Sequence, residues 1–146
     1  MHTSGEPLDR ALSRVLEAYP EVVAAWLFGS VARGEARPDS DLDLGIVLRR
    51  RGDTALDHHR RLRALAADLE TVSEGRTIDL VVLESQGPIF CHRVLSEGRL
   101  VHDADRERRI DFESDTHVRY FDFLPTWRIA AGVALDGFRD WLQARR

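Results

Sequence analysis

Apolar residues along the first two thirds of the chain follow first a helical and then an extended spacing. Leu8, Leu12 and Leu16 recur at helical intervals, which predicts a short amphipathic helix that Pro20 closes. The apolar run from 22 to 28 is rich in β-branched and aromatic residues and predicts a buried strand. Similar patterns predict strands over 41–48 and 77–83, helices over 56–75 and 88–98, and a short edge strand over 100–102. The pattern indicates a small sheet flanked by helices.

The last third of the chain is helical in pattern. Residues 105–123 predict one highly charged helix, and Pro125 separates it from a last helix over 126–142. Apolar residues three and four positions apart form a stripe on this last helix: Trp127, Ala130, Ala134, Phe138 and Trp141. Packing of the stripe against the chain's own sheet is slightly favoured, with an interface to a second copy or another protein as the alternative.

Composition narrows the class of protein. A length of 146 residues suits one domain over 1–146, with a core over about 7–103 and a helical tail over about 104–146. The net charge of −4 gives no reason to expect duplex nucleic acid as a partner. All 21 basic residues are arginines, so a P-loop, which needs a lysine, is excluded.

The single cysteine and the hydropathy pattern indicate where the protein is expected in the cell. Cys91 is the single cysteine, so no internal disulfide can form, and it lies in an apolar helix pattern typical of a core position. The N-terminal residues lack the pattern of a secretory signal, and no apolar run reaches the roughly 20 residues of a membrane span. We therefore expect a cytoplasmic protein with no membrane association.

Two short motifs on either side of a predicted loop carry the candidate chemistry. Gly29 and Ser30 follow the first strand directly, and such a turn lets backbone N–H groups and a hydroxyl approach phosphate oxygens closely. Asp41 and Asp43, after the loop over 34–40, are one residue apart on the next strand, where side chains alternate between faces. Both carboxylates would point the same way and could share a hard cation. Each motif alone is common, but the two together at this spacing indicate a metal-dependent nucleotide site.

Two further residues are candidates for the same site. Asp79 interrupts an apolar strand, where an acid is costly to bury unless it serves a metal or a partner. It is the best third acid, with pairing to a nearby arginine as the alternative. Arg33 lies one turn beyond Ser30, where it could pair with phosphate oxygens, although a role as a plain surface arginine is equally compatible.

The acids suit the transfer of a nucleotidyl group. A pair of Mg²⁺ ions about 4 Å apart can bind the attacking and leaving oxygens of an in-line displacement, and such a pair needs two or three carboxylates. Asp41, Asp43 and Asp79 would be the ligands, and Asp79 could also accept the proton of an incoming hydroxyl. A nucleoside triphosphate would be the substrate.

These motifs resemble those of a known superfamily. Residues 28–36 read FGSVARGEA and residues 40–44 read SDLDL, which is similar to the active-site motif of the DNA-polymerase-beta-like nucleotidyltransferases, and most similar to their minimal members, the MNT proteins. The resemblance implies an α+β fold with a small mixed sheet of three or four strands. It also implies a triphosphate held by Gly29 and Ser30, metals on Asp41 and Asp43, and Asp79 as the third acid.

The resemblance further implies a biological role. Many minimal nucleotidyltransferases are antitoxins encoded beside a HEPN-type ribonuclease, and they transfer AMP from ATP to a tyrosine of that toxin. The short chain has no room for an additional acceptor domain, which supports a protein acceptor. Two alternatives stay open: a non-catalytic antitoxin that neutralises its toxin by binding, and transfer to a small molecule such as an aminoglycoside, with a possible homodimer building the acceptor cleft.

Overall fold

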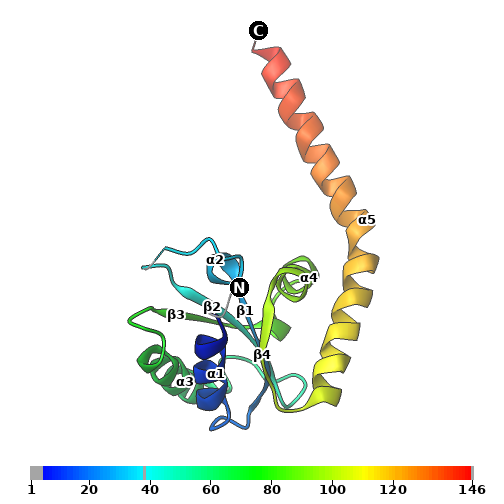
Figure 1. The fold of residues 1–146 in the computed structure, drawn as a ribbon. Coiled ribbons are helices and arrows are strands. Elements are labelled where there is room, and N and C mark those ends of the chain that lie inside the picture. The colour runs from blue at the N-terminus through cyan, green and yellow to red at the C-terminus, as the bar shows by residue number, and fades with distance from the viewer. Residues whose placement is uncertain (1–4, 38, 146) are drawn as a thin grey trace.

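The computed structural model describes residues 5–37 and 39–145, so the predicted loop over 34–40 is described except at residue 38. The helices and strands follow one another in an alternating order (Figure 1): α1 (Gly5–Leu16), β1 (Val22–Phe28), α2 (Gly29–Ala32), β2 (Leu42–Leu48), α3 (His59–Thr71), β3 (Ile78–Val82), the 3-10 helix η1 (Leu83–Ser85), α4 (Pro88–Glu97), β4 (Arg99–Asp103) and α5 (Arg106–Ala144). The predicted α+β class is confirmed.

The strands form one mixed four-stranded sheet in the order β3-β2-β1-β4. β1 lies antiparallel to both β2 and β4, whereas β2 and β3 are parallel. The mixed sheet implied by the family resemblance is therefore present, and β4 is the edge strand predicted over 100–102. Because β1 runs against β2 and β3, the end of β1 and the starts of β2 and β3 meet at the same end of the sheet.

Helices cover both faces of the sheet. α1 and α3 pack on one face over a cluster of buried aliphatic residues, which includes Leu44 and Ile46 of β2. α4 and the first half of α5 pack on the other face, where Trp26 of β1 and Phe112 of α5 lie with ring centroids 6.0 Å apart. Figure 1 shows the sheet between these two groups of helices.

α5 differs from the sequence prediction in one respect. The expected break at Pro125 is wrong, because a single helix runs from Arg106 through Ala144. Proline fixes φ near the helical value, so the helix can continue, and what it loses is the hydrogen bond to the Phe121 carbonyl. The helix axis changes direction where the ribbon turns from yellow to orange in Figure 1, as expected of an internal proline. Asp105 caps the other end, its side chain accepting a hydrogen bond from the N–H of Arg108.

The outer half of α5 projects away from the sheet (Figure 1). The favoured packing of its aromatic stripe against the sheet is therefore wrong. Its large apolar side chains are exposed, as the examples of Trp127 at 46%, Phe138 at 57% and Trp141 at 47% show. The sequence correctly predicted an apolar stripe on a helix, but the spacing of apolar residues does not show what covers them. No helix in residues 5–37 or 39–145 is both long and apolar enough to cross a bilayer.

Candidate active site

A row of three side chains crosses the sheet where β1 ends and β2 and β3 begin. Phe28 pairs with Asp43 across β1 and β2, and Asp43 pairs with Asp79 across β2 and β3. Partners opposite each other on neighbouring strands project to the same face. Leu42 and Leu44 belong to the cluster under α1 and α3, so residue 43 between them projects to the opposite face. The row therefore lies on the face that α4 and α5 cover.

The glycine-serine turn lies against this row. Gly29 begins the four-residue helix α2 with a φ of +74°, a conformation that side chains with a Cβ rarely adopt. A Cβ atom on Gly29 would also collide with Oδ2 of Asp43. Ser30 follows in α2, and no other residue of the described chain forms a hydrogen bond with its hydroxyl group. The two motifs that the sequence singled out are thus adjacent in space.

The other two acids lie at the same sheet end but are more exposed than Asp43. β2 begins at Leu42, so Asp41 lies one residue before the strand and not within it, and its side chain is exposed. Asp79 lies within β3, but it is exposed as well, because β3 is an edge strand. The argument that Asp79 is costly to bury therefore does not apply to this position. Among the described residues no arginine forms an ion pair with Asp79, so the alternative of a paired acid is not supported.

Electrostatics at the row favour a bound cation. Burial raises the pKa of the Asp43 carboxyl group above its usual value of 3.8, and the negative charges of Asp79 and Asp41 raise it further. The Arg33 guanidinium acts against this but is the weakest of the four influences. Carboxylate oxygens are the ligands that hard divalent cations prefer, and a bound cation would offset the repulsion between these carboxylates. Yet no three acidic, histidine or cysteine side chains in residues 5–37 and 39–145 are grouped closely enough to form a complete metal site.

Arg33 lies beside the turn but is engaged elsewhere. Its Nε donates a hydrogen bond to Glu35 at 3.1 Å, and both side chains are exposed. An exposed ion pair of this kind stabilises the fold little, so the guanidinium can exchange Glu35 for another anion at small cost. The arrangement is compatible with either interpretation of Arg33 from the sequence.

The sequence interpretation missed an aromatic corner at the end of the row. Phe28 meets Phe90 of α4 edge to face, with ring centroids 5.6 Å apart. Four residues of α4 at positions i, i+3, i+4 and i+7 face the turn: Phe90, Arg93, Val94 and Glu97. That helical spacing was visible in the sequence, but the register that places Phe28 beside Asp43 was not.

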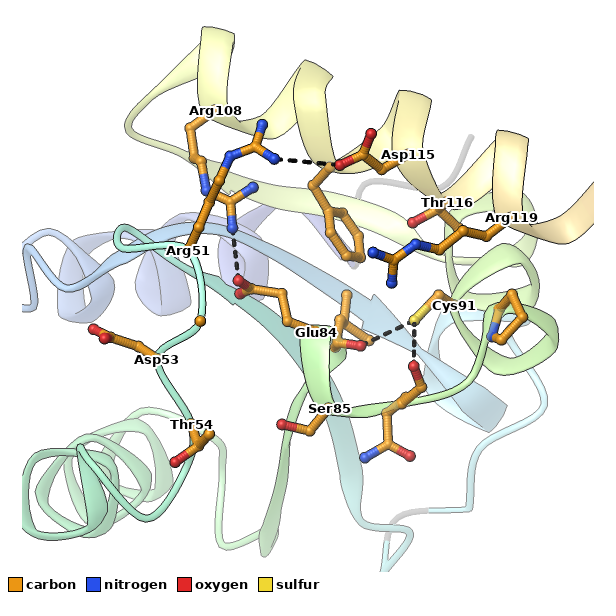
Figure 2. A pocket seen from close by; sticks show the side chains of 15 residues that line it. Arg51, Asp53, Thr54, Glu84, Ser85, Cys91, Arg108, Asp115, Thr116 and Arg119 are labelled. Carbon is orange, nitrogen blue, oxygen red and sulfur yellow. Dashed lines mark hydrogen bonds and ion pairs between the residues drawn. The ribbon is translucent and has the colours of Figure 1, made fainter.

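A different hollow, of about 430 Å³, lies under α5 (Figure 2). Its walls come from the loop after β2, from η1 after β3, and from α4 and α5, so it lies toward the opposite ends of β2 and β3 from the acids. Glu84 is its central feature. Its two carboxylate oxygens accept hydrogen bonds from the N–H of Leu48 and from Nη2 of Arg108, each at 2.6 Å. None of the six predicted site residues lines this hollow.

Comparison with known proteins gives a family match and several structural matches. Residues 10–107 match the protein family described as polymerase beta, nucleotidyltransferase. A solved structure assigned as a minimal nucleotidyltransferase shares 39% identity with the chain, over 67% of this chain and 96% of the other, with a TM-score of 0.51. No curated protein matches the chain.

Two more distant solved structures share the fold over most of their length. A toxin-antitoxin structure with AMP-PNP matches with a TM-score of 0.69 and 20% identity, over 87% of this chain and 98% of the other. A complex of a tri-AMPylated HEPN toxin and an MNT antitoxin from Shewanella oneidensis matches with a TM-score of 0.65 and 18% identity, over 89% of this chain and 98% of the other.

Proposed function

Because the chain belongs to the polymerase beta nucleotidyltransferase family, we propose that it transfers AMP from ATP to a hydroxyl group of a partner protein. The partner would be a HEPN-type ribonuclease toxin, and this chain its antitoxin. The observation that carries the proposal is the convergence of Gly29, Asp43 and Asp79 at one end of the sheet, on the face of α4. ATP is a cytoplasmic metabolite, so we place the reaction in the cytoplasm.

Each residue of the site has a role in the proposed reaction. The turn at Gly29 and Ser30 binds the triphosphate through backbone N–H groups and the Ser30 hydroxyl, and Arg33 exchanges Glu35 for a phosphate oxygen. Asp41, Asp43 and Asp79 would hold Mg²⁺. Because Asp41 and Asp79 are exposed, the cations could keep water molecules among their ligands. Bound there, the cations would neutralise phosphate charge and align the attacking and leaving oxygens.

The transfer exchanges one bond to the α-phosphorus for another. The acceptor hydroxyl oxygen bonds to the α-phosphorus, the bond from phosphorus to the bridging oxygen breaks, and pyrophosphate leaves. Asp79 accepts the hydroxyl proton, because it is the exposed member of the paired acids and has no arginine partner in the described chain. Asp43 is less suited to this step, since Gly29 lies close against its Oδ2 atom.

Two observations support a protein acceptor. The exposed apolar side chains on the outer half of α5 form a surface that a second protein could cover. Among proteins of the same fold, one structure is a complex of an AMPylated HEPN toxin with an MNT antitoxin, and another toxin-antitoxin structure contains AMP-PNP. These likenesses supply the partner class and the nucleotide for this proposal.

The test is to incubate the purified chain, and a HEPN-type protein encoded beside it, with magnesium and ATP labelled at the α-phosphate. Label should appear on the partner, and Asp43→Asn should reduce it by at least about a hundredfold, as expected when a metal ligand is lost. Asp39→Asn, an exposed acid of the same loop, is the matched control and should keep full activity.

Three results would contradict the proposal. Labelling of the partner by ATP that carries its label at the γ-phosphate would indicate phosphoryl transfer instead. Equal labelling by wild-type protein and by the Asp43→Asn variant would show that Asp43 is not needed for the transfer. Suppression of the toxin by an Asp41→Ala, Asp43→Ala double variant would indicate neutralisation by binding alone.

A further inference from the structure

An aromatic hollow of about 250 Å³ opens beside the glycine-serine turn. We call it the aromatic pocket, and its lining is Phe28, Gly29, Arg33, Phe90, Arg93, Val94 and Glu97. Phe28 and Phe90 are half-buried, so part of each ring faces the open space, whereas Val94 is 2% exposed and closes the base of the wall. Binding sites for whole drug-sized molecules are about 300–1,000 Å³, so this volume suits a single flat ring system.

The pocket lies beside the acidic row and shares Phe28 with it. Phe28 pairs directly with Asp43 across β1 and β2, and therefore lies next to the carboxylates on the same face. Gly29 and Arg33, which the proposed reaction uses for the phosphates, are also part of the pocket wall. A molecule whose phosphates rest on the turn would have its other end within reach of the two phenylalanines.

The rim of the pocket carries one donor and one acceptor side by side. Arg93 and Glu97 lie one turn apart on α4 and form an ion pair at 3.5 Å, with side chains 71% and 46% exposed. Such a pair is weak and opens easily. The Glu97 carboxylate can accept a hydrogen bond from an exocyclic amine, and the Arg93 guanidinium can donate one to a ring nitrogen. Adenine presents these two groups next to each other on one edge.

We propose that the aromatic pocket binds the base of the donor nucleotide, with Phe28 and Phe90 against the ring and with Arg93 and Glu97 at its polar edge. This inference rests on the proposed function, because it assumes that a nucleoside triphosphate is the donor. It assigns base recognition to α4, a helix outside both sequence motifs. The acceptor side chain then approaches from the exposed Asp79 side of the row.

The position of the pocket favours the donor's base over an aromatic acceptor ring. The base is covalently joined to the phosphates, so a pocket that shares Gly29 and Arg33 with the phosphate turn is always within its reach. An acceptor ring must instead place its hydroxyl in line with the leaving pyrophosphate, across the α-phosphorus from the turn. A site bounded by the turn itself is on the wrong side for that attack.

The test compares two magnesium-bound ligands by calorimetric titration of the full chain: AMP-PNP, which has a base, and tripolyphosphate, which has none. Wild-type protein should bind AMP-PNP more tightly. Phe90→Leu, which keeps an apolar side chain but removes the ring, should weaken AMP-PNP about tenfold, the usual effect of losing one base stack, and leave tripolyphosphate affinity unchanged. Phe90→Tyr keeps the ring and should weaken AMP-PNP binding less than Phe90→Leu does. Phe123→Leu, at an exposed position on α5, is the matched control and should also change neither affinity.

A second measurement addresses the polar edge. Inosine triphosphate carries an oxygen where ATP carries the exocyclic amine, so wild-type protein should prefer ATP, and Glu97→Gln should reduce that preference about tenfold. Equal weakening of AMP-PNP and tripolyphosphate by Phe90→Leu, no weakening of either, or an unchanged ATP preference in Glu97→Gln would overturn the inference. Failure of wild-type protein to bind either ligand would instead refute the proposed function, so the two failures are distinguishable.

Discussion

A Cβ atom on Gly29 would lie 3.2 Å from the carboxyl carbon of Asp43 and would collide with its Oδ2 atom. The first motif therefore needs glycine for two reasons, the positive φ of the turn and the space that the acid of the second motif occupies. Phosphate oxygens bound at the turn would lie beside the acid for the same reason. The spacing of the two motifs in the sequence reflects this direct contact.

We predict that Gly29→Ala abolishes nucleotidyl transfer and lowers the free energy of unfolding by about 2 kcal/mol, through backbone strain and collision with Asp43. Gly34→Ala is the matched control, because Gly34 has a similar φ of +71° and no atoms within 4 Å of its Cβ position. It should cost about 1 kcal/mol and keep activity. Activity and denaturant unfolding check both values, and equal loss of activity in the two variants would rule out the contact with Asp43 as the cause.

We predict that Asp43→Asn stabilises the protein at pH 7 in the absence of magnesium. The folded state raises the pKa of Asp43 above its usual 3.8, so folding favours the protonated acid, and stability falls as the pH rises through the folded pKa. Asparagine removes that penalty. Thermal unfolding should show a higher melting temperature for the variant at pH 7, and the gain should disappear below about pH 3.8. A variant less stable than wild type at pH 7 would contradict this sign.

We predict that Glu84→Ala lowers the free energy of unfolding by about 3 kcal/mol, because it leaves the buried Arg108 without its carboxylate. The Arg108 side chain is 11% exposed, and its Nε already lacks a partner within the described chain. Glu97→Ala removes an acid from an exposed ion pair on α4 and should cost no more than about 0.5 kcal/mol. Urea unfolding of both variants measures the difference, and similar losses would show that burial of the Glu84 pair is unimportant.

We predict that Cys91 resists alkylation in the native protein. Cys91 is 4% exposed, its Sγ donates to the Leu83 carbonyl oxygen at 3.0 Å, and burial raises the pKa of the thiol to about 11. Iodoacetamide at pH 8 should leave native protein unmodified over hours and label it within minutes in urea, as mass spectrometry would show. Rapid labelling of native protein would show that α4 detaches from η1 in solution.

Local patterns predicted the sheet well. β1 occupies the predicted residues 22–28, and β2 and β3 begin one residue later than expected, because an apolar run flanked by polar residues marks a buried strand clearly. Spacing alone singled out Gly29, Ser30, Asp41 and Asp43, whereas Asp79 was chosen by a burial argument that its exposure does not support. Their catalytic roles stay predictions, since they depend on ligands bound at the site.

Features that depend on long-range contacts were not predictable. Whether Asp79 is buried depends on β3 being an edge strand, and the pairing of Phe28 with Asp43 depends on strand register. The pattern around Pro125 showed a proline but not that the helix continues through it. The aromatic stripe was recognised, yet only the direction of α5 shows that the sheet does not cover it.

The continuity of α5 has a mechanical consequence. Phe112 and Thr116 anchor the helix against the sheet face that carries the acids, and the same helix extends about 28 Å beyond Pro125. A protein bound to that extension would be connected to the acidic end of the sheet by one continuous helix, which is weakened only at Pro125. In the proposed transfer, the helix would limit the angles at which a bound partner can present a hydroxyl group, so its length and bend would select among acceptor positions.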